Sequence, residues 1–135
     1  MLVKNNFLDL RYSKGHVYRG LDIKTPQRNG FCCFSDPCWC VYEVALIFIK
    51  NYRNFGIKTY QKILENYLKD RYIWTCFSKF SFLPHECPGS LLDYAQFIYE
   101  LAFYLHPRHL RKNVSFNVDY IYSVLKSFNF DKYVS

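Results

Sequence analysis

Cysteine is the residue type in this sequence whose spacing could most directly do chemistry. Four of the six cysteines lie close together and a fifth ends the motif His85-Glu86-Cys87; the four are Cys32, Cys33, Cys38 and Cys40. A structural zinc site needs four such ligands, commonly in Cys-x2-Cys pairs, and that pairing is absent from this sequence. In a helix, Cys38 and Cys40 would point about 200° apart. We therefore predict small buried thiols without a metal or cofactor, and keep a zinc site and a disulfide as alternatives.

Glu43 is the one carboxylate in the apolar run from Cys38 to Ile49. A carboxylate buried without a partner would be costly. We therefore predict that Glu43 pairs with an arginine or a lysine, or accepts hydrogen bonds from tyrosines. The alternative is a functional buried carboxylate, because perturbed carboxylates cluster at catalytic and ligand-binding sites. No nucleophile, base and orienting group stand at a recognisable spacing, so we expect no catalytic residues.

A short basic turn is predicted after Pro107 and contains Arg108, His109, Arg111 and Lys112. Cations grouped in this way can hold the phosphates of a nucleic acid or the surface of an acidic protein. Aromatic side chains nearby could stack on the bases of a single strand. A second basic set lies in the first 34 residues and comprises Lys14, Arg19, Lys24 and Arg28. The alternative for both sets is an ordinary solvated surface.

Composition limits the class of protein. The chain has 135 residues, 50% of them hydrophobic and 21% aromatic, with a net charge of +7 and a pI of about 9.1. This length suits one domain with a real core, and the composition excludes general disorder. The positive charge favours an acidic partner. Since the first residues do not form an apolar signal segment, we expect an intracellular protein in a reducing compartment, such as a host-cell cytoplasm or an organelle matrix, that is not secreted.

The element predicted to lie at the centre is a helix at about 37–54. Asp36 is a typical N-cap, Pro37 suits the first helical position, and Gly56 follows the predicted end. The run is apolar on all sides, which is typical of a helix in the middle of a core. It is too short to span a membrane, which requires about 20 apolar residues.

The other elements are predicted to pack around this helix. Further helices are expected at about 58–72, 91–105 and 118–129. Ser90 and Asp93 form a variant capping box, His106-Pro107 ends the helix that they begin, and Asn117 caps the last one. Residues 1–34 are predicted to form an irregular arm, with a surface loop at 24–30, held by Phe7, Leu10, Tyr18 and Leu21. The predicted fold is a single all-α domain, a compact bundle of four to five helices in which 35–135 form the core.

These features favour a small, non-enzymatic interaction protein that acts through its surface. The first interpretation is a basic subunit of a larger assembly, such as an organellar complex, that contacts RNA or an acidic protein through Arg108, Arg111 and Lys112. The alternative is a viral or parasite helical protein that binds a host protein in a surface groove. An enzyme of unknown type is a remote third interpretation. The sequence leaves the partner, the organism and the oligomeric state open.

Overall fold

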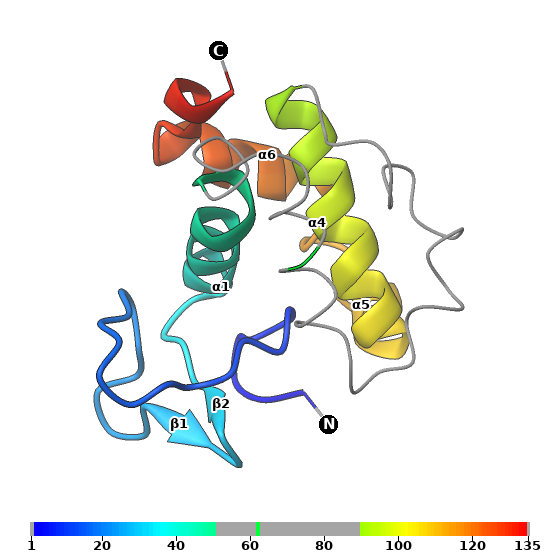
Figure 1. Ribbon diagram of the computed structural model, residues 1–135. Helices are drawn as coiled ribbons and strands as arrows, with labels where there is room; N and C mark the ends of the chain where they lie inside the picture. The colour runs from blue at the N-terminus through cyan, green and yellow to red at the C-terminus, as the bar shows by residue number, and fades with distance from the viewer. Residues whose placement is uncertain (1, 51–61, 63–89, 135) are drawn as a thin grey trace.

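The computed structural model describes residues 2–50, 62 and 90–134 (Figure 1). Helix predominates within these residues, which confirms the prediction of a mostly helical protein. The strands and α-helices are β1 (Gln27–Arg28), β2 (Phe31–Cys32), α1 (Pro37–Ala45), α4 (Leu91–Leu105), α5 (Pro107–Lys112) and α6 (Val118–Ser127). A 3-10 helix follows at Phe130–Tyr133. The helix predicted at 58–72 lies outside the described residues, so a bundle of four to five helices stays a prediction.

Helix α1 begins where the sequence predicts. Asp36 has extended backbone and its Oδ1 accepts a hydrogen bond from the Cys38 N–H at 2.9 Å, with Pro37 at the first helical position. The α-helical geometry ends at Ala45, earlier than predicted, and a π-helical turn continues over Leu46–Lys50. Residues 51–54 of the predicted helix lie outside the described residues. The helix is buried on one side, while Trp39 and Tyr42 are only partly covered.

Helices α4 and α6 pack on one another, and α6 also packs on α1 (Figure 1). The predicted N-caps are confirmed, because the Ser90 hydroxyl accepts the Asp93 N–H and the Asn117 Oδ1 accepts the Tyr120 N–H. Most buried side chains of α4 recur every three or four residues along its length, and Phe97 is buried beside them: Leu91, Tyr94, Ala95, Phe97, Ile98, Leu101 and Ala102. This spacing places them on one face of the helix, which supplies a large part of the core.

Residues 2–34 are irregular, as predicted, but they contribute to the core instead of only covering it. Leu8 is fully buried, and the Phe7 ring stacks on the Phe116 ring with centroids 4.4 Å apart. The buried Asn6 side chain accepts the Leu10 N–H and donates to the carbonyls of Leu10 and Cys32. Of the predicted anchors, Phe7 and Leu10 are buried, and Tyr18 and Leu21 pack against the core partly exposed.

The predicted surface loop at 24–30 is wrong in part, because it contains strand β1. Strands β1 and β2 pair antiparallel, with Arg28 opposite Phe31. Asn29 and Gly30 connect them with φ angles of 55° and 84°. A two-residue hairpin turn of this kind requires positive φ at both positions, and Asn-Gly is the sequence that adopts it most readily. The signal for this hairpin was therefore present in the sequence.

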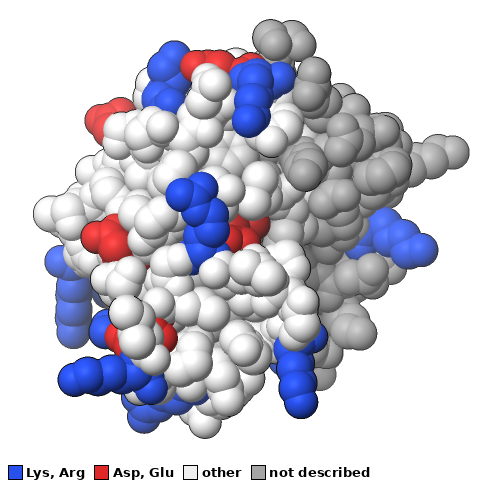
Figure 2. All heavy atoms as spheres, turned by 90° about the vertical axis from the view of Figure 1, so that its left-hand side faces the viewer, with Lys and Arg blue, Asp and Glu red and all other residues white. Residues whose placement is uncertain are grey.

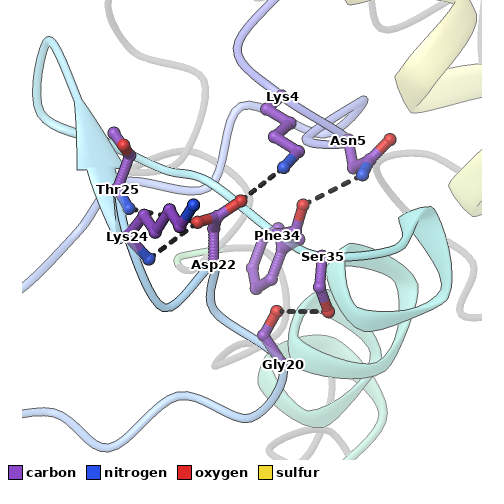
Figure 3. Close-up of polar contacts among 8 residues, drawn as sticks. All are labelled: Lys4, Asn5, Gly20, Asp22, Lys24, Thr25, Phe34 and Ser35. Atoms are coloured by element: carbon purple, nitrogen blue, oxygen red, sulfur yellow. Dashed lines mark hydrogen bonds and ion pairs between the residues drawn. The ribbon is translucent and has the colours of Figure 1, made fainter.

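Polar contacts hold the segment around this hairpin (Figure 3). The Asp22 carboxylate accepts the N–H groups of Lys24 and Thr25 through Oδ1 and forms an ion pair with Lys4 through Oδ2. The hydrogen bond from Lys4 is the main reason why the pKa of Asp22 is lowered to about 2. The carbonyl of Gly20 accepts hydrogen bonds from both the backbone N–H and the hydroxyl of Ser35, close to the start of α1.

Gly20 lies against the indole of Trp39, and we expect Gly20→Ala to destabilise the fold strongly. Its φ is +75°, and an added Cβ would lie 2.0 Å from Trp39 Cγ. The left-handed backbone and the overpacking together should lower the free energy of unfolding by about 3 kcal/mol. Urea unfolding followed by tryptophan fluorescence measures this loss.

Gly15→Ala is the matched control, since Gly15 has φ +92° with no atom within 4 Å of the added Cβ. This variant carries the backbone strain alone and should lose about 1 kcal/mol. Equal losses in the two variants would contradict the steric role of Trp39.

A buried hydrogen-bonded pair of side chains connects residues 2–34 to the corner between α4 and α5. His106 Nε2 lies 2.6 Å from Asp9 Oδ1, and the two side chains are 4% and 9% exposed. Removing one member of such a pair is strongly destabilising, because the remaining group loses a partner that water cannot replace. We expect His106→Ala to lower the free energy of unfolding by about 3 kcal/mol.

His109→Ala is the control, because it removes an exposed α5 ring that lies 5.9 Å from the His106 ring but leaves the pair with Asp9 in place. It should change the free energy of unfolding by less than about 0.5 kcal/mol. Asp9→Asn keeps a residue that tolerates the positive φ of 50° at this position and removes only the charge. A His106→Ala variant as stable as the His109→Ala variant would show that the pair adds nothing.

Candidate functional site

The predicted basic site lies on α5, a short helix held by one buried side chain, Leu110. Its four predicted binding residues are all exposed: Arg108, His109, Arg111 and Lys112. Arg108, Arg111 and Lys112 are three and four residues apart, so they share one face of the helix, opposite Leu110. The structure therefore brings the three strong cations together on an exposed surface, which we call the α5 basic face.

The α5 basic face carries positive charge with little local neutralisation. Helix α5 contains no acidic residue, and among the described residues no carboxylate forms an ion pair with Arg108, Arg111 or Lys112. The Arg111 guanidinium carbon lies 5.5 Å from the centroid of the Phe103 ring, a cation–π distance. A guanidinium placed in this way keeps its N–H donors free to point outward toward an anion.

The second predicted basic set is exposed but more dispersed. Residues 2–34 contain six lysines and arginines against two aspartates. Figure 2 shows Lys and Arg side chains spread over the lower part of the face that carries this segment, with acidic side chains between them. Lys14, Lys24 and Arg28 are exposed, whereas Arg19 has a structural contact of its own.

The Arg19 guanidinium lies on a cluster of three aromatic rings. Its central carbon is 5.0 Å from the Trp39 ring, 4.9 Å from the Tyr42 ring and 5.7 Å from the Phe128 ring. Stacking on several rings favours the cation where it stands. Arg19 therefore connects residues 2–34 to α1 and to the end of α6, and we assign it to the fold and not to partner binding.

Glu43 is buried on α1 at 4% exposure, but its partners differ from those predicted. Its Oε2 accepts the backbone N–H of Arg19 at 2.9 Å, and its Oε1 lies 3.8 Å from His16 Nε2. A backbone amide and an imidazole thus stand where the sequence indicated a cationic side chain or tyrosine hydroxyls. Nothing local to residue 43 in the sequence could reveal partners 24 and 27 positions earlier.

A cavity of about 360 Å³ opens beside Glu43. Its lining comes from residues 9–18 on one side and from α1 and the following turn on the other: Asp9, Leu10, Arg11, Ser13, His16, Tyr18, Glu43 and Ile47. The Tyr18 hydroxyl holds the wall in shape, since it donates to the Arg11 carbonyl and accepts the Ser13 N–H. Glu43 can be singled out from the sequence, whereas the roles of His16 and Tyr18 cannot, because they depend on how residues 9–18 fold against α1.

The four described cysteines are free thiols. Cys32, Cys33 and Cys40 are buried and Cys38 is partly exposed. Burial is the main cause that raises the pKa of Cys32 and Cys40 to about 12 and that of Cys38 to about 11. Among the described residues no three His, Cys, Asp or Glu side chains gather as a metal site. His85 and Cys87 lie outside the described residues.

Comparison of the chain with protein-family models, with curated proteins and with solved structures finds no match. The roles of Glu43 and of the α5 basic face are therefore inferred from their own burial, charge and contacts. In the part of the chain that the structure describes, no helix is both long and apolar enough to cross a membrane.

We expect Cys38 to react slowly with iodoacetamide, because its raised pKa keeps the thiol protonated at pH 8. Its alkylation should be more than about tenfold slower than that of free cysteine and should rise with pH toward 11. Peptide mass spectrometry follows Cys38 separately from the other cysteines. Asp36→Asn keeps an N-cap but removes the charge that helps to raise this pKa, so this variant should react faster. Alkylation of Cys38 in the native protein at the rate of free cysteine would contradict the raised pKa of this thiol.

Proposed function

We propose that this chain is a small, non-enzymatic basic protein that binds RNA through the α5 basic face, as a subunit of a larger assembly. The observation that carries the proposal is the placement of Arg108, Arg111 and Lys112 on one exposed face of a helix anchored by Leu110. The Cβ atoms of residues at this spacing lie about 5–6 Å apart, so the charged ends of their long side chains can contact neighbouring phosphates.

Two further features favour RNA as the partner of the α5 basic face. Arginine supplies planar N–H groups that match phosphate oxygens, and two of the three cations are arginines. The Phe103 ring beneath Arg111 adds an aromatic surface beside the charges, and single-stranded nucleic acids bind to cationic surfaces interleaved with aromatic rings. An acidic protein would also be attracted, but it would not need the aromatic neighbour.

The non-enzymatic part of the proposal is supported by the state of the candidate nucleophiles. A cysteine nucleophile acts as a thiolate, and the raised pKa values of Cys32, Cys38 and Cys40 oppose that form near neutral pH.

Binding of a fluorescein-labelled single-stranded RNA of mixed sequence, measured by anisotropy between 50 and 200 mM KCl, tests the proposal. Wild-type affinity should fall steeply with salt, because phosphate contacts release counterions. In Arg108→Ala/Arg111→Ala/Lys112→Ala the slope of log K against log salt should decrease by about 2, since each single-strand contact contributes about 0.7.

Lys14→Ala/Lys24→Ala/Arg28→Ala is the matched control, because it also removes three exposed cations. It should keep most of the slope, and circular dichroism should show both variants folded. Equal losses in the two triple variants would assign binding to net charge and overturn the role of α5. Binding to polyglutamate without binding to RNA at 50 mM salt would replace RNA by an acidic protein.

A further inference from the structure

The Glu43 carboxylate has an acceptor oxygen without a donor. Its Oε2 accepts the Arg19 N–H at 2.9 Å. Its Oε1 lies 3.8 Å from His16 Nε2, which is too long for a hydrogen bond. No other donor from the described residues reaches this oxygen. The oxygens of a carboxylate this deeply buried ordinarily accept hydrogen bonds. Oε1 can therefore accept one more, from a donor that the described residues do not supply.

This oxygen lines the cavity between residues 9–18 and α1, which is of the size that holds a small molecule. Leu10 and Ile47 supply an apolar part of the wall. The rings of His16 and Tyr18 supply an aromatic part, with centroids 4.4 Å apart. A few polar groups in an otherwise apolar and aromatic concavity are the usual composition of a ligand site.

The charges around the cavity favour a ligand of positive charge. Glu43 and Asp9 bring two carboxylates to the lining, and Asp9 is also bonded to His106. Arg11 lines the cavity as well, and its guanidinium carbon lies over the Phe31 ring at 5.3 Å. An anion would meet the buried Glu43 charge at close range, whereas a cation would be attracted to it and to the faces of the aromatic rings.

We propose that this cavity binds a small organic primary ammonium group, with one ammonium N–H donated to Glu43 Oε1 and the alkyl part against Leu10, Ile47 and the ring of Tyr18. A primary ammonium carries three donors on a compact head, so it can satisfy Oε1 and still reach the hydroxyl groups of the lining. The ammonium belongs either to a free small amine or to the lysine side chain of a partner. This ligand is distinct from the RNA of the proposed function, and either proposal can fail without the other.

The test is a titration of the 15N-labelled chain with n-butylammonium chloride, with the Arg19 amide as the reporter because that N–H is bonded to Glu43. The Arg19 signal should shift and saturate with a dissociation constant on the order of a few millimolar, as expected for a ligand of this size. The neutral isostere n-butanol, at equal concentration and ionic strength, should not shift the Arg19 signal. This pair of ligands needs only the wild-type protein.

Glu43→Gln keeps the size of the side chain and an acceptor for the Arg19 N–H but removes the charge, and should weaken binding at least tenfold. Glu100→Gln, which changes a carboxylate on α4, is the control and should bind as the wild type does. Tighter binding of Nα-acetyl-lysine amide than of n-butylammonium would assign a partner's lysine, and weaker binding a free amine. Absence of an Arg19 shift, an equal shift with butanol, or full binding by a folded Glu43→Gln variant would overturn the proposal.

Discussion

The buried charge of Glu43 is the constraint on which the position of residues 2–34 depends. The carboxylate stands on α1, away from water, and must be compensated inside the protein. The donor is the backbone N–H of Arg19, and the Arg19 side chain lies on the rings of Trp39, Tyr42 and Phe128. Arg19 thus bonds one oxygen of the buried acid through its N–H and covers the aromatic cluster with its side chain. Displacement of the segment would remove both contacts together, which makes its attachment cooperative.

The other buried polar side chains of the described core serve the same segment. Asn6 bonds to the backbone of Leu10 and Cys32, and His106 pairs with Asp9. Apolar packing alone specifies position loosely, whereas a buried polar group tolerates only the arrangement that satisfies it. Residues 2–34 have little regular secondary structure to fix their backbone. The three buried polar groups therefore fix the backbone position of this segment, as hydrogen bonds between neighbouring strands fix a strand in a sheet.

The parts of this fold that the sequence could predict are those set by local signals. The caps at Asp36, Ser90 and Asn117 act within three residues of themselves, so their patterns indicate helix starts directly. The turn at Asn29-Gly30 is equally local. The short strand before it was not predicted, because its residues belong to a continuous polar stretch that is typical of a loop. Exposure of the basic residues after Pro107 also follows from their type.

Contacts between residues far apart in the chain could not be predicted from the sequence. Asp9 and His106 are 97 positions apart, and Arg19 and Glu43 are 24 apart. No pattern near either partner marks these pairs, because each depends on how the irregular segment 2–34 crosses the helices. Glu43 could be singled out as a carboxylate that needs compensation, yet its donor is a backbone group, which every residue possesses. The cavity beside Glu43 also depends on how residues 2–34 pack against the helices, so it could not be predicted from the sequence either.

The two candidate sites differ in charge and burial, and this difference would keep the two proposed ligands apart. The cations of α5 are hydrated, so their attraction for phosphates is screened by salt. Glu43 lies in a medium of lower dielectric, where a charge acts more strongly and screening is weaker. A phosphate is therefore repelled from the cavity, and an ammonium group from α5. Among the described residues, Asp9 connects the two sites, because it lines the cavity and pairs with His106, the residue immediately before α5. A linkage between the two sites that is carried by side-chain contacts would therefore act through the Asp9–His106 pair.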